Sequence, residues 1–404
     1  MDEVSTKESQ EMSSSSISRK IPLLGLLTLL TIAAAALLHV NQPEFILGRF
    51  VNVSEFEYAL FDGVLYLSYL IFGLTTGALS DRWKRRRLFI IIGSASSVPF
   101  YWLMTLAESY SLLLVFRFLQ GVFTVMVWQT LMTLALDFST PHNRGKNMGV
   151  FGAFLALAMG MGPAVGGLVA SYGIYMPYYS AAILNVIVFV IAAIFLRDPK
   201  MPKERPTLRD SIGIVLRKPV LIVPGLFNFI DRLHIGFILT VLPLFLSIVL
   251  GLSESLRGYS LAIFALPFII LQYPMGRLSD RYGRYKPLII GSLGYGTVLI
   301  FLGIIGSTGF SSLLVMLVLL GVFSGITAPP SMALVGDAIG SEDSAMAMGF
   351  FNFLGNVGIT LGPIVLGIIL TLSDFVIAFV VAGLMELFTL MVNLILVRFI
   401  FKEV

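Results

Sequence analysis

Apolar residues recur along the chain in long runs that short polar segments separate. Between Pro22 and Ile400 we count twelve such runs, and a helix needs about 20 apolar residues to cross a hydrocarbon core of ~30 Å. Their unbroken apolar character excludes the alternating pattern of a membrane β-barrel. The pattern therefore predicts an all-α polytopic membrane protein. Its expected transmembrane helices cover 22–42, 58–80, 88–107, 111–136, 147–171, 177–196, 219–250, 258–279, 287–306, 311–336, 344–371 and 375–400.

The polar segments divide the chain into four parts. Residues 1–20, with "SSSSIS", are of low complexity and predict a disordered tail. The apolar run behind this tail is too long for a signal peptide, so we interpret it as the first span. Two blocks of six spans, 21–196 and 219–404, flank a charged and proline-rich connection at 197–218. This connection predicts a cytoplasmic linker with one short surface helix.

Composition and charge agree with a membrane protein. The chain is 57% hydrophobic and 12% charged, with a mean hydropathy of +0.92, so part of its solvent must be lipid. Cysteine is absent, which excludes disulfides and thiolate metal sites. Of 27 Lys and Arg residues, 23 fall on one side of the predicted spans, while Arg49 and Arg257 fall on the other. By the positive-inside rule both termini are cytoplasmic, and a plasma-membrane location is expected. The net charge of +4 therefore reflects topology and gives no reason to expect nucleic-acid binding.

The chain repeats itself at an offset close to 200. "GALSDRWKRRR" at 77–87 corresponds to "GRLSDRYGRYK" at 276–286, Asp137 to Asp337, and Gly162–Pro163 to Gly362–Pro363. Six spans are thus followed by six similar spans in the same orientation, which predicts two pseudo-symmetric bundles. Such internal repeats are typical of secondary transporters, whose substrate site lies near mid-membrane between the repeats.

These repeated residues resemble the cytoplasmic loop signature of the major facilitator superfamily. The first copy carries Gly77, Asp81 and Arg85, and the second carries Gly276, Asp280 and Arg284; position 84 is Lys where the signature has Gly. The resemblance implies a conformational latch in which Arg85 also meets Asp137 and Arg284 meets Asp337. The alternative is a topology signal of positive charge, the role expected for Arg86 and Arg87.

A second resemblance concerns the drug–proton antiporters of this superfamily. "LLVFRFLQG" at 113–121 is similar to the fourth span of proton-coupled members, and "MGPAVGG" at 161–167 to the fifth span of the antiporters. The glycines suit close helix packing, and the proline allows a bend. The residues of this helix-bending motif are Gly162, Pro163, Gly166 and Gly167, with Gly362 and Pro363 as the partial copy in the second half.

Charged residues in the middle of the seventh span are the clearest candidates for proton coupling. Asp231, Arg232 and His234 lie about twelve to fifteen residues into this span, where ionisable groups are costly and by default face a cavity or a partner. At helical spacing Asp231 and His234 share one face, and Arg232 lies on another. The first half has Thr31 and Ile32 at the matching positions, which favours a function over a packing device common to both halves. A static Asp–Arg lock is the alternative.

The first half has a polar group of its own, nearer the outer boundary. Asp62 and Arg117 lie within roughly 10 Å of that boundary by helix rise, so they can pair. His39 and Glu44 fall at a similar level. The resemblance implies that Arg117 modulates a proton site, for which Asp62 is the nearest carboxylate, while a fixed structural pair is the alternative. Glu386 in the last span faces the bundle or anchors packing, and the sequence leaves both open.

Aromatic, methionine and amide side chains on the spans expected to line a central cavity are candidates for substrate contact. They are Tyr66, Tyr69, Met126, Trp128, Gln129, Gln272, Asn352 and Asn356.

The sequence thus predicts a monomeric, proton-coupled transporter that works by alternating access and exports hydrophobic or amphipathic small molecules. Uptake of a small anionic metabolite through Arg232 and transport of lipid-linked cargo are the alternatives. An enzyme or sensor is disfavoured, because the three histidines fall on different segments and no nucleotide, metal or nucleophile motif occurs. No cofactor is expected.

Overall fold

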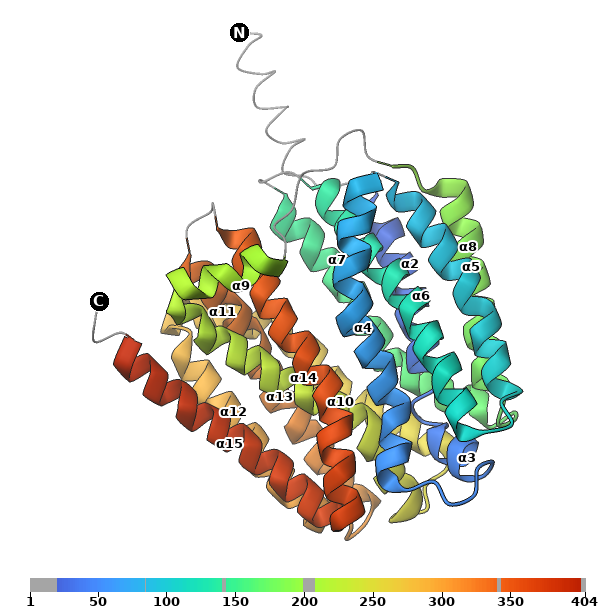
Figure 1. Ribbon diagram of the computed structural model, residues 1–404. Helices are drawn as coiled ribbons and strands as arrows, with labels where there is room; N and C mark the ends of the chain where they lie inside the picture. The colour runs from blue at the N-terminus through green and yellow to red at the C-terminus, as the bar shows by residue number, and fades with distance from the viewer. Residues whose placement is uncertain (1–19, 84, 140–142, 199–207, 340–342, 401–404) are drawn as a thin grey trace.

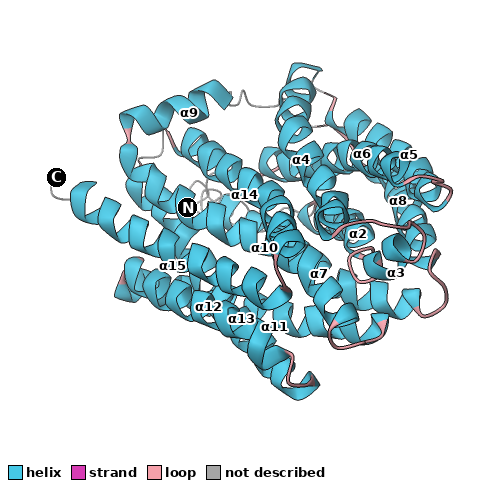
Figure 2. Ribbon diagram, turned by 60° about the horizontal axis from the view of Figure 1, so that its bottom comes forward, coloured by secondary structure: helices cyan, strands magenta, loops and turns pink. Residues whose placement is uncertain are grey.

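The structure is a computed structural model that describes residues 20–83, 85–139, 143–198, 208–339 and 343–400. These residues form helices joined by turns and loops (Figure 2). Within them, eleven helices are long and apolar enough to cross a membrane, and a shorter apolar helix precedes them. The predicted all-α polytopic fold is therefore confirmed. The helices that match the predicted spans are α2 (Ile21–Ala36), α4 (Glu55–Trp83), α5 (Arg86–Thr105), α6 (Tyr110–Asp137), α7 (Arg144–Ala170), α8 (Met176–Phe195), α10 (Ile222–Ile248), α11 (Glu254–Tyr282), α12 (Tyr285–Gly306), α13 (Phe310–Ala338), α14 (Ser344–Leu372) and α15 (Phe375–Ile400).

Helix α2 is shorter than the span predicted over 22–42. After Ala36 the backbone tightens, because the His39 N–H donates to the Ala36 carbonyl at 3.3 Å and the Asn41 N–H donates to the Leu38 carbonyl at 3.2 Å. A second short helix, α3 (Gln42–Leu47), then begins with Pro43 in its first turn, where proline's missing N–H is not needed. The first span therefore ends in a turn that carries polar side chains into the protein.

The helices pack as two groups that lie side by side (Figure 1). The N-terminal half comprises α2 and α4–α8, and the C-terminal half comprises α10–α15. Between them, α9 (Leu208–Arg217) and the 3-10 turn at Pro219–Leu221 fall where the linker was expected to hold a surface helix. We call the two ends of the molecule the α3 end and the α9 end after these helices (Figure 1). The predicted tail at 1–19 and residues 199–207 of the linker lie outside the described residues.

Each half is built around its own apolar core. In the C-terminal half Phe237, Leu299 and Phe379 are fully buried together, and in the N-terminal half Leu131 and Val188 are. Many large apolar side chains instead remain exposed on the outer surface of the helices, which is the arrangement expected where lipid is the solvent.

The halves meet along two helix pairs, α7 with α11 and α4 with α14, which we call the seam. A Cβ atom added to Gly167 of α7 would lie 2.3 Å from the Glu254 carbonyl oxygen, and one added to Gly258 of α11 would lie 2.5 Å from the Pro163 carbonyl oxygen. The two backbones therefore touch directly, as small residues permit in membrane helices. In the second pair, the Phe56 N–H donates to the Thr371 hydroxyl at 3.0 Å.

The other glycines of the predicted helix-bending motif also serve close packing. Cβ atoms added to Gly162 and Gly166 would lie 2.5 Å from Ala36 Cβ and 2.2 Å from the Leu37 carbonyl oxygen, so α7 packs tightly against the first span. In the second half, Gly362 packs equally closely against the Leu233 carbonyl of α10. Helices α7 and α14 continue through Pro163 and Pro363.

Candidate functional site

Asp62 is the centre of a buried polar network near the α3 end. Its side chain is fully buried on α4, and the expected partner Arg117 on α6 donates from Nη2 to Asp62 Oδ1 at 2.9 Å. The Gln42 amide of α3 donates to both carboxylate oxygens, at 3.0 Å and 2.9 Å. His39 Nδ1 lies 3.3 Å from Asp62 Oδ2. A buried carboxylate needs such donors, because nothing else replaces the water it has lost.

The sequence "RFLQG" extends this network along α6. Arg117 and Gln120 are one helical turn apart, and Arg117 Nη1 donates to Gln120 Oε1 at 3.1 Å. The Gln120 amide then donates to the Tyr101 hydroxyl at 2.9 Å and to the Thr124 hydroxyl at 2.6 Å. All four side chains are fully buried. Arg117 is therefore held in one orientation, with its guanidinium directed at Asp62.

The network also crosses from one half of the protein to the other. Thr240, on α10 of the C-terminal half, places its hydroxyl 3.0 Å from Asp62 Oδ2 and 2.9 Å from its own helix's Gly236 carbonyl. The hydroxyl has one hydrogen, so it can donate to only one of them at a time. An ionised Asp62 attracts this hydrogen to the contact between the halves. No pattern in the sequence indicates Thr240 or Gln42, since both contacts depend on how separate helices dock.

A second polar contact joins the halves at the same end. Arg257 of α11 is fully buried, and its Nη2 lies 2.6 Å from Glu44 Oε2 of α3. The Ser247 hydroxyl of α10 donates to the other Glu44 oxygen at 3.3 Å. Sequence reasoning placed Glu44 at this depth but counted Arg257 only as a loop charge. Helix α3 thus contacts Asp62 through Gln42 and the C-terminal half through Glu44.

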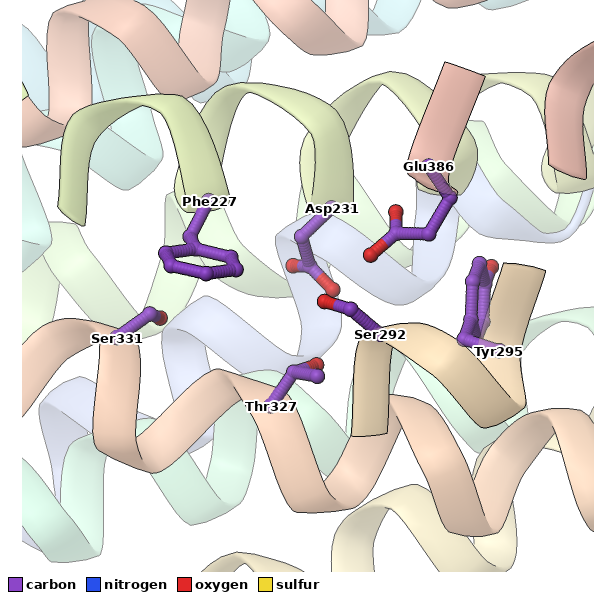
Figure 3. A pocket seen from close by; sticks show the side chains of 7 residues that line it. All are labelled: Phe227, Asp231, Ser292, Tyr295, Thr327, Ser331 and Glu386. Atoms are coloured by element: carbon purple, nitrogen blue, oxygen red, sulfur yellow. The ribbon is translucent and has the colours of Figure 1, made fainter. Parts of the chain in front are cut away.

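The acidic cluster of the C-terminal half lies inside its bundle, away from the seam (Figure 3). His234 Nδ1 of α10 lies 3.2 Å from Glu386 Oε2 of α15, and His234 Nε2 lies 2.9 Å from the Ala382 carbonyl. Because that carbonyl can only accept, Nε2 carries a hydrogen, and a proton on either Nδ1 or Glu386 would turn the first contact into a hydrogen bond. Glu386, whose surroundings the sequence left open, therefore faces the bundle.

Asp231 belongs to this cluster through a shared cavity. Its carboxylate and that of Glu386 line the same small space, together with Tyr295 and three hydroxyl residues, Ser292, Thr327 and Ser331 (Figure 3). The predicted common face of Asp231 and His234 is therefore real, and it faces α12, α13 and α15. Two carboxylates in one cavity repel each other when both are ionised.

Arg232 lies on a different face of α10. Its side chain is partly buried and rests against α14, where a Cβ atom on Gly355 would lie 3.2 Å from Arg232 Cγ. Within the described part of the chain Arg232 forms no ion pair, so the ion pair that the alternative of a static Asp–Arg lock requires is not found there.

In each half, at the α9 end, an arginine of the repeated loop binds an aspartate of a neighbouring helix. In the C-terminal half, Arg284 Nε donates to Asp337 Oδ2 at 2.7 Å and its Nη1 binds Asp280, as expected. These hydrogen bonds, above all the one that Arg284 donates to Asp337, raise the pKa of Arg284, so its charge is permanent at any physiological pH. Gly283 just before it has φ +87°, a conformation that suits glycine and closes the turn in one residue.

In the N-terminal half the expected Arg85–Asp137 contact is wrong. Arg86 Nε binds Asp137 instead, its Nη1 donates to the Ser80 hydroxyl at 2.9 Å, and Arg86 is fully buried while Arg85 is exposed. Arg86 lies six residues after its partner Ser80, whereas Arg284 lies five residues after the matching Ser279, so the turn holds one residue more and Arg86 occupies the place of Arg284. Arg86 was expected to be a topology charge only.

Three further residues, Asp81, Gly77 and Gly276, belong to the expected latch. The side chain of Asp81 lies outside the described residues. A Cβ atom on Gly77 would meet nothing within 4 Å, and one on Gly276 would lie 3.8 Å from Pro329 Cβ, so neither glycine is in tight contact.

The predicted substrate residues are spread over several environments. Tyr66 is buried with its ring 6.0 Å from that of Tyr69, and Asn352 is exposed. The others are partly buried: Met126, Trp128, Gln129, Gln272 and Asn356. The structure instead contains an apolar pocket between the halves that the sequence did not indicate, with lining residues from α7, α10, α11 and α13. They are Ala156, Met159, Ile235, Leu239, Leu261, Phe264, Ala265, Phe268 and Ser324.

A family comparison decides which group of proteins has this architecture. The model of the Major Facilitator Superfamily matches residues 24–253 and again residues 225–403, which together cover nearly the whole described chain. The chain belongs to the major facilitator superfamily. Family and homologues together point to a transporter rather than an enzyme.

Individual members of the superfamily show how this chain relates to known transporters. It is 26% identical over 320 residues to the class B tetracycline resistance protein of Escherichia coli, covering 76% of this chain and 78% of that protein. It is 26% identical over 203 residues to the quinolone resistance protein NorA of Staphylococcus aureus, about half of each chain (49% and 50%). The crystal structure of the nucleoside transporter NupG has the same fold, with a TM-score of 0.74 at 13% identity over 93% of this chain and 98% of that one.

Proposed function

We propose that this protein is a proton-coupled transporter that works by alternating access and exports hydrophobic or amphipathic small molecules. The observation that carries the proposal is Asp62, a fully buried carboxylate whose hydrogen-bond donors come from both halves. A proton on Asp62 removes the negative charge that holds Arg117 and Thr240. Proton binding is thereby linked to the contact between the halves.

The position of these contacts gives the coupling a direction. Thr240–Asp62, Ser247–Glu44 and Arg257–Glu44 all join the halves near the α3 end. The positive-inside pattern puts this end at the cell exterior, and the contacts there support a state that is closed to the outside. Protonation of Asp62 weakens one of these contacts and shifts the population toward the state that is open outside.

The apolar pocket between the halves supports the proposed substrate class. It lies between helices of both halves, which is where a transporter of this architecture exposes its cargo to each side in turn. Its lining by Met159, Phe264 and Phe268 suits molecules with an apolar or aromatic body. Resistance to tetracycline and to quinolones, after which two relatives are named, is consistent with export.

We further propose that Asp231, His234 and Glu386 form a second proton-binding site. Its groups contact one another within one bundle, so its protonation changes the packing of α10 against α15 and not the seam directly. Because Thr240 is on the same helix α10, the two sites can influence each other through a rigid element.

Transport in proteoliposomes tests the proposed function. We expect purified protein to accumulate tetracycline, a quinolone or a dansyl amide when a pH gradient is imposed, with an accumulation of about tenfold for each pH unit at one proton per substrate. A protonophore should abolish the accumulation, and protein-free vesicles serve as the control. Transport of all these compounds only down their own gradients, with no response to the pH gradient, would contradict the proposal.

A further inference from the structure

The apolar pocket between the halves has a positive charge beside it. Two of its lining residues, Ile235 and Leu239, lie three and seven positions after Arg232 on α10. This spacing places all three side chains on one face of the helix. Arg232 is not itself a lining residue, but it lies on the face of α10 that lines the pocket, one helical turn before Ile235.

Arg232 differs from two other arginines of the membrane-crossing helices, Arg117 and Arg257. Arg117 and Arg257 are fully buried, and each is ion-paired, with Asp62 and with Glu44 respectively. Arg232 is only partly buried and has no ion-pair partner in the described residues. Its neighbour in sequence, Asp231, is directed into the cavity that it shares with Glu386 (Figure 3).

Space for the Arg232 side chain comes from Gly355 of α14. A Cβ atom at this position would lie 3.2 Å from Arg232 Cγ and 2.4 Å from the Asn228 amide nitrogen. The Asn228 amide is itself fixed, because it donates to the Phe351 carbonyl at 2.7 Å. The stem of Arg232 thus packs against α14 at Gly355, and its guanidinium lies outside ion-pair distance of the described carboxylates.

A guanidinium at this depth is costly without a counter-charge. Water can solvate it while the cavity is open, but closure of the cavity around cargo removes that water. An anionic group on the cargo would then supply the missing partner through charge-assisted hydrogen bonds, which a guanidinium makes in pairs with carboxylate, sulfonate or phosphate oxygens.

We infer that the substrates of this transporter are amphipathic anions, with an apolar body in the pocket and an acidic head group on Arg232. The inference rests on the proposed function for the direction and energy source of transport. It narrows the substrate class and gives Arg232 a role in binding, in place of the proton coupling that the sequence suggested.

Three probes with one body and different head groups test this inference by equilibrium binding. Dansyltaurine carries a sulfonate, dansylethanolamine is neutral, and dansylethylenediamine carries an ammonium group. Binding is measured by fluorescence with protein in lipid nanodiscs, without any gradient. For the wild type we expect dansyltaurine to bind about tenfold more tightly than the neutral probe, as ~1.4 kcal/mol of charge-assisted bonding provides. The ammonium probe should bind most weakly.

Arg232→Gln should reduce the preference for dansyltaurine to about one while binding of the neutral probe stays within about twofold, because the apolar pocket is unchanged. Arg232→Lys is the matched control and should retain part of the preference, since it keeps the charge but not the paired donors. If Arg232→Lys retains part of the preference for dansyltaurine, the loss in Arg232→Gln is a loss of charge recognition and not of folding.

The possible results separate this inference from the proposed function. Equal binding of all three probes, or tighter binding of the ammonium probe, overturns the inference even if pH-driven transport is observed. A preference for dansyltaurine that Arg232→Gln leaves intact also overturns it, because the anion is then recognised elsewhere. Preferential, Arg232-dependent binding without pH-driven transport would support the inference and contradict proton coupling.

Discussion

Asp62→Asn is expected to abolish accumulation against a gradient while downhill exchange of substrate continues. Asparagine has the shape of a protonated aspartate and still accepts a hydrogen bond from Arg117, so the fold should be retained. It cannot change its charge, so proton binding is no longer linked to the Thr240 contact. In proteoliposomes the accumulation ratio should fall from about ten per pH unit to about one.

The pH profile of exchange provides a second measurement for the same variant. The wild-type exchange rate should depend on pH, because protonation of Asp62 weakens its contacts with Arg117 and Thr240, and the profile of Asp62→Asn should be flatter. Glu55→Gln is the matched control, since it neutralises an exposed acid in the first turn of the same helix. Uphill accumulation by Asp62→Asn at the wild-type level would show that the buried network is only structural.

Arg86→Ala is expected to reduce stability strongly, whereas Arg85→Ala should leave it almost unchanged. Arg86 is fully buried, and its removal leaves the buried Asp137 without this partner, which typically costs ~3–5 kcal/mol. Arg85 is exposed, and exposed substitutions usually change stability by less than ~0.5 kcal/mol. Thermal unfolding of the purified variants in nanodiscs should give a clearly lower melting temperature for Arg86→Ala alone.

Arg284→Ala in the second half provides an internal comparison. Its ion pairs with Asp280 and Asp337 are largely exposed, so its loss should cost about 1 kcal/mol or less. A larger effect for Arg85→Ala than for Arg86→Ala would restore the register that the family signature implied. Equal effects of Arg86→Ala and Arg284→Ala would mean that burial does not distinguish the two loops.

The positions of the spans could be predicted closely from the sequence, because each apolar run is delimited by charges or by glycine and proline. The helix predicted at 258–279 covers Glu254–Tyr282, and that predicted at 375–400 has the same limits in the structure. The first span is the exception. Its apolar run continues beyond Ala36, but the backbone turns there and begins α3 before Pro43.

The candidate site could be predicted only where depth alone brings residues together. Asp62 and Arg117 lie at one level of one bundle, and they are in contact. Thr240 and Arg257 reach their partners through docking of the two halves, which leaves no periodic signal in either half. His234 and Glu386 are on spans far apart in the chain, and their contact depends on the packing of α10 against α15.

The loop signature failed for a different reason. A consensus fixes the kinds of residue but not the register of a turn, and here one additional residue moves the buried charge from Arg85 to Arg86. The exposure of neighbouring arginines on one loop therefore cannot be read from a motif. It depends on the local path of the backbone.

The glycine contacts between α7 and α11 have a consequence for the speed of the transporter. Where Gly167 and Gly258 lie against carbonyl oxygens, no side chain of either glycine interlocks with the opposite helix. Helices α7 and α11 can therefore separate at these two glycines without a change of side-chain rotamer. We therefore expect the rate of opening at this point to depend more on the polar contacts near the α3 end than on side-chain packing between α7 and α11.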